Sequence, residues 1–261
     1  MMYQQLEAKL HDAFWEEEGA PAELPLIEHF LGQYPGAALE LGCGSGRLLL
    51  PLLEKGFLIE GLDVSSEMLA MCRERAKSSQ PVLHEAGMED FNTGTLFSAI
   101  LIPAFTLQLI SPDRLPATLN NIQRHLQPGG GLYLTTFIPW AEITGELTEE
   151  EWFLDQEMKL PEGCVARCHT CFHIERISQK LSREHRYEIL DTNGNITETS
   201  TSFQRLCWYW PREMRSLLAD LGFTVQQVIG DFAPEGGCDE DSQVITYIAR
   251  WNPAVTAKEA T

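Results

Sequence analysis

The sequence predicts an α/β protein in which a doubly wound sheet carries an antiparallel β insertion. Two observations carry this prediction. Between residues 38 and 137, short apolar runs alternate with helical segments, which is the pattern of βαβ units. Residues 165–178, 180–190 and 196–206 have strand composition instead, and Asp-Thr-Asn-Gly-Asn between the last two is a strong hairpin signal.

Composition and charge limit the partners of this protein. The 261 residues are 44% hydrophobic, and 38 acidic against 19 basic side chains give a formal net charge of −19. That charge repels phosphate backbones and anionic membrane surfaces, so we expect no nucleic acid and no membrane as partner. The sequence shows no apolar run long enough for a bilayer span and no signal peptide, and its seven cysteines suit free thiols. We therefore expect a cytoplasmic protein.

Two helices are expected before the alternating region. Residues 3–18 place Leu6, Leu10 and Phe14 at helical spacing between polar residues, and a second helix is expected at 26–33, after a break rich in glycine and proline.

The segment Ala38–Leu48 joins the first strand to a helix through three glycines at alternate positions. Gly42, Gly44 and Gly46 lack a Cβ, so the chain can turn sharply and its backbone can approach a ligand closely. The following helix, expected at 47–55, directs its electropositive end at that ligand. The third glycine arrives one residue earlier than in the dinucleotide fingerprint, which argues against NAD.

An acidic residue ends the second expected strand, at 57–63. Asp63 lies roughly twenty residues after the first glycine, where a carboxylate can accept hydrogen bonds from both hydroxyls of a ribose. Asp63 could instead cap the helix expected at 65–77, but Ser65 can serve as that cap.

The remaining core elements continue the alternation. The strand at 96–105 ends beside the first strand, at the topological switch point where open α/β sheets bind ligands. The other expected elements are strands at 81–83, 127–137, 223–232 and 242–251 and helices at 115–126 and 212–221.

With its Glu-x-Gly-x-Gly-x-Gly loop, Asp63 and the Leu-x-Pro-Gly-Gly turn at 126–130, the sequence resembles the class I S-adenosylmethionine (SAM)-dependent methyltransferases of the small-molecule type. The resemblance implies a seven-stranded Rossmann-like methyltransferase sheet, an antiparallel lid after the fifth strand, and SAM as cofactor. It implies a SAM-binding core at 1–137, an acceptor lid at 138–206, the last core elements at 207–251 and a flexible tail at 252–261. The cofactor-binding residues it implies are Glu40, Gly42, Cys43, Gly44, Gly46, Asp63, Val64, Met68, Gly87, Met88, Glu89, Ile102 and Pro103.

Two positions depart from the family pattern. Gly87 stands where relatives often have the acid that bonds the adenine amino group, and Ser98 stands where many have aspartate. We therefore expect adenine recognition to rest on the backbone around Met88, or on Glu89 or Asp90.

The expected reaction is methyl transfer to a small molecule (EC 2.1.1) by in-line displacement, in a monomer or homodimer. A good nucleophile needs no catalytic residue, whereas an oxygen acceptor needs a general base, for which His169, His173 and His185 are candidates, with Tyr187 as a polar contact. The alternatives are a protein methyltransferase, a SAM-binding protein without catalysis and, last, a NAD-dependent oxidoreductase.

Three cysteines in the insertion form a competing motif. Cys164, Cys168 and Cys171 match the C-x3-C-x2-C pattern of radical SAM enzymes, and His169 and His173 allow a zinc site. However, the triplet follows a complete set of cofactor-binding strands, and cysteines on strands are most often small buried hydrophobic residues. We therefore expect ordinary packing and no metal.

Overall fold

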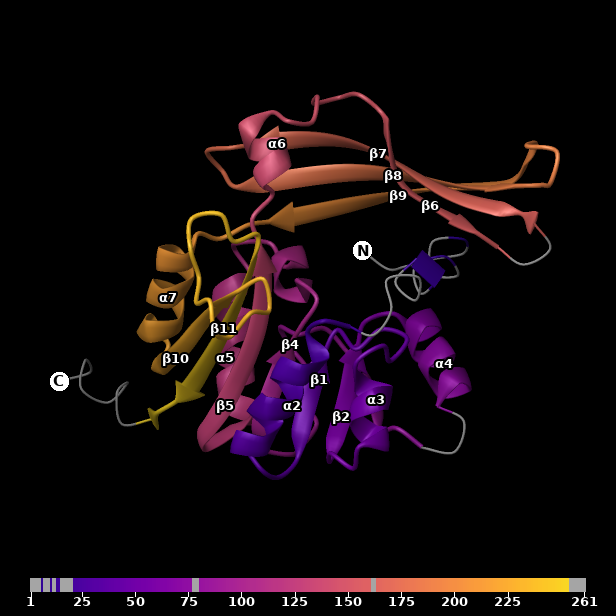
Figure 1. The fold of residues 1–261 in the computed structure, drawn as a ribbon. Coiled ribbons are helices and arrows are strands. Elements are labelled where there is room, and N and C mark those ends of the chain that lie inside the picture. Colours follow the sequence, from indigo (N-terminus) through magenta and orange to yellow (C-terminus); the bar gives the residue numbers. More distant parts are fainter. Residues whose placement is uncertain are drawn as a thin grey trace. The chain divides into compact units, whose positions relative to one another are not determined.

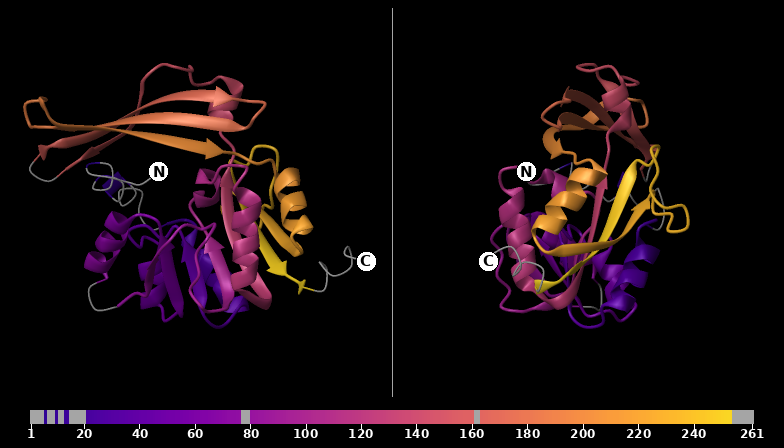
Figure 2. Two further views of the ribbon diagram at one scale, coloured as in Figure 1. Left: turned by 180° about the vertical axis from the view of Figure 1, so that it is seen from behind. Right: turned by 90° about the vertical axis from the view of Figure 1, so that its left-hand side faces the viewer.

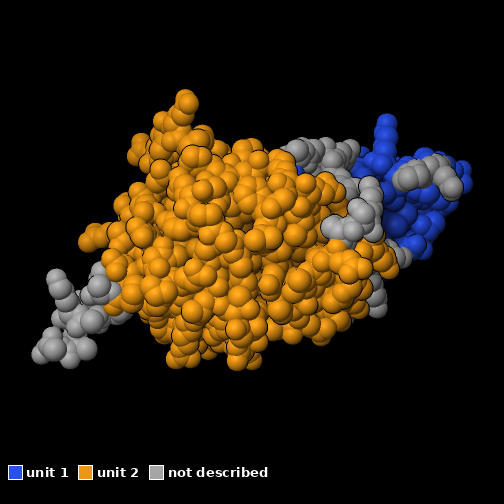
Figure 3. Space-filling model, turned by 90° about the horizontal axis from the view of Figure 1, so that it is seen from below, with its two compact units in different colours: residues 1–21, 139–207 blue, residues 22–138, 208–261 orange. Residues whose placement is uncertain are grey.

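The computed structural model describes Leu6, Leu10, Ala13, Phe14 and residues 21–76, 80–160 and 163–253. The chain forms two compact units, coloured separately in Figure 3: residues 22–138 with 208–261, and residues 139–207 with 1–21. We refer to them as the core unit and the insertion unit. Most of the expected helix at 3–18 and of the expected tail lies outside the described residues.

The core unit contains the predicted seven-stranded sheet, with the strand order β10-β11-β5-β4-β1-β2-β3 (Figure 1). Strand β1 is parallel to both β2 and β4, whereas β11 is antiparallel to β5 and β10. The prediction of a doubly wound sheet is thus confirmed, and the switch point lies between β1 and β4. The strands are β1 (Ala38–Leu41), β2 (Ile59–Asp63), β3 (Leu83–Glu85), β4 (Phe97–Ile102), β5 (Leu126–Phe137), β10 (Phe223–Gly230) and β11 (Val244–Trp251).

Helices cover both faces of this sheet; α2 and α5 lie on opposite sides in the right-hand view of Figure 2. Side chains of α2, α3 and α4 share one hydrophobic cluster with the sheet. Within it, Phe30 is fully buried and its ring centroid lies 5.6 Å from that of Tyr133. The helices of the core unit are α2 (Leu24–Gln33), α3 (Leu49–Glu54), α4 (Ser66–Arg75), the 3-10 helix η1 (Thr106–Leu109), α5 (Leu115–His125) and α7 (Pro211–Asp220).

Several expected boundaries in the core unit were wrong by two or three residues: β4 ends at Ile102 and not at residue 105, and α2 begins at Leu24 and not at residue 26. Helix α3 begins at Leu49 and not at residue 47, because the glycine turn extends to that point. Strand β3 spans Leu83–Glu85 and not 81–83, since its register follows β2, with Asp63 opposite Glu85.

The insertion unit contains a four-stranded antiparallel sheet in the order β6-β7-β8-β9. The predicted hairpin joins β8 to β9: the Asp191 carboxylate accepts backbone hydrogen bonds from Asn193 and Asn195, each at 2.9 Å, and Gly194 has φ +84°. Strand β6 and helix α6 were not predicted. The elements are α6 (Trp140–Thr144), β6 (Phe153–Lys159), β7 (Val165–Glu175), β8 (Lys180–Leu190) and β9 (Ile196–Cys207).

The contacts group the first 21 residues with the insertion unit, whereas the resemblance implies that residues 1–137 form the cofactor-binding core. Leu6, Leu10 and Phe14 are buried and form a cluster with side chains of the insertion sheet, among them Ala166 and Tyr187. Burial of these apolar side chains against the sheet explains the grouping.

In the part of the chain that the structure describes, no helix is both long and apolar enough to span a membrane.

Candidate active site

The loop between β1 and α3 has a conformation that only glycine adopts at low cost. Gly42, Gly44 and Gly46 have φ angles of +74°, +53° and +87°. A Cβ on Gly42 would lie 2.3 Å from Cγ2 of Thr106, the first residue of η1. The carboxyl end of β1 is therefore a close-packed turn formed by backbone atoms, which suits close approach of a ligand.

We expect Gly42→Ala to destabilise the core unit and to abolish binding in this loop. The positive φ costs about 1–2 kcal/mol for any residue with a Cβ, and the clash with Thr106 adds about 1–3 kcal/mol. Gly56→Ala is the matched control, because Gly56 has a φ of +88° and nothing within 4 Å of the Cβ position. Thermal unfolding should show a clearly larger loss of stability for Gly42→Ala; equal losses would contradict the close packing.

Asp63, at the end of β2, fixes this loop. Its Oδ2 accepts a hydrogen bond from the Gly44 amide at 2.9 Å, and its Oδ1 accepts one from the Ser65 amide at 2.8 Å. Ser65 is the N-cap of α4, where its hydroxyl accepts a hydrogen bond from the Met68 amide at 3.2 Å. The capping role thus belongs to Ser65. A carboxylate accepts about four hydrogen bonds, so Asp63 keeps acceptor capacity for a ligand.

Two buried carboxyl groups lie near the same edge of the sheet. Glu23, immediately before α2, accepts a hydrogen bond from the Ala104 amide at 3.3 Å; burial raises its pKa to about 7, although the Thr135 hydroxyl and the charge of Arg47 lower it. Burial, and then the negative charge of Glu23, raise the pKa of Glu40 well above its usual value. Oε2 of Glu40 has no hydrogen-bond partner among the described residues.

These carboxyl groups suit a ligand that carries a positive charge. An unmatched buried acceptor is costly, and a ligand ammonium would supply both the missing donor and the opposite charge. Glu40 follows from the sequence motif, but Glu23 does not, because nothing in the local sequence indicates that a residue before α2 lies beside β4 and β5.

The loop after β4 forms the third side of the site. Ile102 is fully buried, and the carbonyl of Pro103 accepts a hydrogen bond from the Thr106 hydroxyl at 2.7 Å. Ala104 and Phe105 have positive φ angles of 51° and 62°, which are strained for residues other than glycine. Strain of this kind is common at ligand sites, and no sequence pattern signalled it here.

The predicted adenine loop after β3 is fixed by α5. The Asn121 amide donates hydrogen bonds to the carbonyls of Met88 and Phe91, each at 3.2 Å. Glu89 pairs with Arg114, so its carboxylate already has a partner. The other predicted residues range from buried Cys43 and Met68 to half-exposed Val64.

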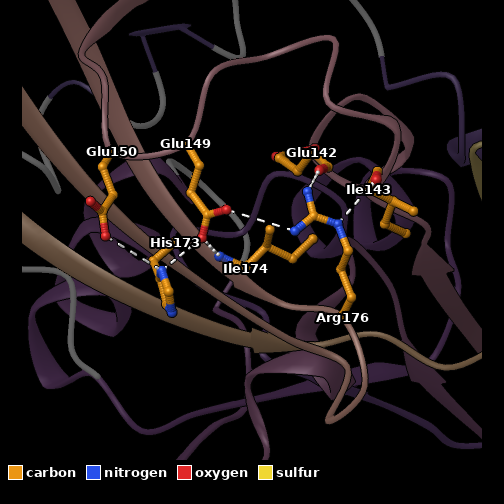
Figure 4. Close-up of polar contacts among 7 residues, drawn as sticks. All are labelled: Glu142, Ile143, Glu149, Glu150, His173, Ile174 and Arg176. Carbon is orange, nitrogen blue, oxygen red and sulfur yellow. Dashed lines mark hydrogen bonds and ion pairs between the residues drawn. The ribbon is translucent and has the colours of Figure 1, made fainter.

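The base candidates lie in the insertion unit, and the ring centroids of His185 and Tyr187 are 6.2 Å apart. His173 is exposed and pairs with Glu149 at 2.7 Å, in a set of contacts that joins residues 142–150 to β7 (Figure 4). Nδ1 of His169 lies 3.7 Å from a carboxylate oxygen of Glu188. This nitrogen has no hydrogen-bond partner among the described residues. His185 and Tyr187 lie two residues apart on β8; burial lowers the pKa of His185 to about 4.

The three cysteines do not form a cluster. Cys168 and Cys171 are three residues apart on β7, so their side chains point to opposite faces of the sheet. Within the described ranges, the cysteines of this motif do not group with one another as ligands for a metal ion. The radical SAM interpretation therefore has no structural support.

Comparisons with known proteins agree with this geometry. Residues 38–130 match the methyltransferase domain family. A Geobacillus protein (strain WCH70) that is assigned by name to the methyltransferases is 23% identical over 92% of this chain and 96% of its own length. The dTDP-3-amino-3,6-dideoxy-α-D-glucopyranose N,N-dimethyltransferase of Streptomyces fradiae is 33% identical over 51% of this chain and 52% of its own length.

The fold is also similar to that of a solved structure. An S-adenosylmethionine-dependent methyltransferase from Clostridium acetobutylicum has a TM-score of 0.78 with 16% identity, over 94% of this chain and 97% of that one. The matched domain contains the glycine loop, Asp63 and the switch point described above. Residues 38–130 therefore match a methyltransferase domain, and the chain has the fold of S-adenosylmethionine-dependent methyltransferases.

Proposed function

We propose that this protein transfers a methyl group from SAM to a small-molecule acceptor. The observation that carries the proposal is the joint arrangement of the glycine loop, Asp63 and the buried Glu40 at the carboxyl ends of β1 and β2. When bound, SAM supplies an activated methyl group on a sulfonium. The work left to the protein is to align the acceptor with that methyl group and to exclude water.

The residues of the core unit suit the parts of SAM. Asp63 would accept hydrogen bonds from the ribose hydroxyls, while the unmatched Oε2 of Glu40 suits the ammonium of the methionine part. The backbone at Met88 is the better candidate for the adenine, because Glu89 is paired with Arg114. Gly42, Gly44 and Gly46 let the backbone approach the cofactor, and the predicted roles of Cys43, Val64, Met68, Gly87, Ile102 and Pro103 are to line the same pocket.

For the acceptor we propose a small amine. The Streptomyces relative is named for dimethylation of an amino sugar nitrogen. A neutral amine has a lone pair that attacks without a general base; its N–H proton then passes to water or to a nearby acceptor group. Alignment of this kind can contribute up to about 7–11 kcal/mol to lowering the barrier.

The base candidates provide a test of the amine assignment. With an amine acceptor, we expect alanine at His169, His173 or His185 and phenylalanine at Tyr187 to leave kcat within about tenfold of wild type, since none is needed to activate the nucleophile. Loss of a true general base would lower kcat about 10²–10⁴-fold with SAM affinity intact. A loss of that size at one histidine would contradict an unassisted amine and identify the base.

Single-turnover assays with methyl-labelled SAM and a panel of amines, alcohols and peptides test the function itself. Label in a small amine supports the proposal. Label in peptides alone would favour a protein methyltransferase, and no transfer despite SAM binding would favour a binding protein.

We further propose a cytoplasmic location, since all seven cysteines are thiols, and a monomeric or homodimeric state.

A further inference from the structure

A second cluster of chemically active side chains lies in the insertion unit, on three neighbouring strands. Asp155 comes from β6, Cys168 from β7 and His185 from β8. Their donor atoms, a carboxylate oxygen, a thiol sulfur and an imidazole nitrogen, all lie within 4.8 Å of one another. Cys168 is buried and Sγ lies 3.9 Å from Nδ1 of His185.

An irregularity in the sheet lies at the carboxylate of this cluster. The β6–β7 pairing shifts register between Leu154 and Gln156, so Asp155 is the extra residue of a β-bulge. Phe153 pairs with Thr170, and the Thr170 hydroxyl bonds Oδ2 of Asp155 at 2.7 Å, so the Asp155 side chain lies on the face of Thr170. Bulges of this kind are frequent next to functional sites.

A buried hydroxyl links two of these side chains. The Thr170 hydroxyl donates a hydrogen bond to Oδ2 of Asp155 at 2.7 Å and lies 2.8 Å from Nδ1 of His185. A metal ion bound to Nδ1 would take the place of the contact between His185 and Thr170. Arg183, two residues before His185 on β8, is paired with the buried Glu142 at 2.5 Å, which offsets its charge.

We propose that Asp155, Cys168 and His185 bind a divalent transition metal ion, and that the metal is Zn²⁺. Zinc takes sulfur, nitrogen and oxygen ligands, whereas Mg²⁺ and Ca²⁺ prefer oxygen alone. In a tetrahedral zinc site the sulfur and nitrogen ligands lie about 3.5 Å apart, so the pair at 3.9 Å needs to close by only a few tenths of an ångström. Three protein ligands leave one position for water, and Thr170 then serves as a hydrogen-bond partner of the Asp155 ligand.

The histidine suits this role in two further respects. The side chain of Gln204 on β9 hydrogen-bonds its ring, as is usual for histidines that bind metals, and its Nδ1 is one of the three atoms that lie within 4.8 Å of one another. Binding releases the thiol proton of Cys168 to solvent and involves no redox change. The sequence motif included Cys164 and Cys171, which the proposed site does not use, and the proposal departs from the expectation that the protein binds no metal.

The test begins with the full-length protein from which metal has been removed by a chelator. This protein is titrated with Zn²⁺ in competition with a second chelator whose absorbance reports the Zn²⁺ it binds. Titration with Co²⁺ then reports a thiolate ligand through charge-transfer absorption. We expect one tightly bound ion per chain and an affinity lowered at least about tenfold in Cys168→Ser, His185→Gln and Asp155→Asn. The matched controls Cys171→Ser and His173→Gln should bind Zn²⁺ as wild type does.

Each variant is first compared with wild type by circular dichroism and by S-adenosylhomocysteine binding, which reports folding of the core unit separately from the metal. Asp155 is exposed, so Asp155→Asn tests the site with little risk to the fold. The proposal is overturned if the wild type binds no stoichiometric Zn²⁺, or if the three ligand variants retain wild-type affinity.

Discussion

Replacing Asp63 with alanine should lower the affinity for S-adenosylhomocysteine about 5- to 150-fold, which corresponds to about 1–3 kcal/mol. Two losses add up in this variant. The ligand hydroxyls lose their acceptor, and the Gly44 and Ser65 amides lose the carboxylate that now fixes the loop at 2.9 and 2.8 Å. Isothermal titration calorimetry on the purified variant measures the change directly.

Two further variants separate these losses. Asp63→Asn keeps one acceptor oxygen, so we expect an intermediate affinity. Asp220→Ala removes an exposed carboxylate at the end of α7 and should bind as wild type does. Unchanged affinity in Asp63→Ala would remove this residue from the cofactor site and leave it only a role in the structure of the loop.

Glu23 should make the stability of the protein fall as the pH rises from about 4.5 to 7. Its pKa is about 7 in the folded protein against 4.5 for an ordinary glutamate, so in this window the folded state binds the proton more tightly than the unfolded state does. Stability therefore decreases with pH, by about 3 kcal/mol for a shift of this size. Glu40, whose pKa is also raised, acts in the same direction.

Glu23→Gln removes this titration while its amide oxygen can still accept the hydrogen bond from Ala104. We expect the variant to be more stable than wild type at pH 8 and to have a flatter profile of unfolding free energy between pH 5 and 8. Glu235→Gln, in an exposed loop, is the control. Parallel profiles for Glu23→Gln and wild type would show that Glu23 does not titrate in this window.

The same variant tests the link from Glu23 to cofactor binding. Ionised Glu23 attracts the positive charges of SAM, so wild-type affinity should rise between pH 6 and 8, and Glu23→Gln should weaken that rise. Tyr133, Thr135, Arg47 and the Ala104 amide also face this carboxyl group. Calorimetric titrations with S-adenosylhomocysteine at several pH values measure how the affinity changes with pH. Glu235→Gln, in an exposed loop, is again the control.

Local sequence was sufficient to predict the core sheet and the central part of its site. The apolar runs, the glycines of the loop and the acid at the end of β2 are signals that lie within short stretches of sequence, and the structure bears out the doubly wound sheet that they predict. Ser65 as the cap of α4 also followed from position alone.

The parts that sequence did not predict depend on contacts between distant segments. Strand β6 is rich in acidic and polar residues, and it is a strand only because β7 supplies its hydrogen-bond partners. Glu23 and Thr106 join the site through packing against residues that are remote along the chain. The approach of Asp155, Cys168 and His185 likewise depends on the pairing of three strands, which the cysteine motif does not encode.

The central claim is that the loop of Gly42, Gly44 and Gly46, with Asp63 and the buried carboxyl groups, forms a SAM site. Calorimetric titration of the wild-type protein with S-adenosylhomocysteine, followed by NAD as a competitor, tests it most directly. We predict one site per chain with micromolar affinity, and no displacement by NAD. Absence of binding, or displacement of the bound ligand by NAD, would contradict the account.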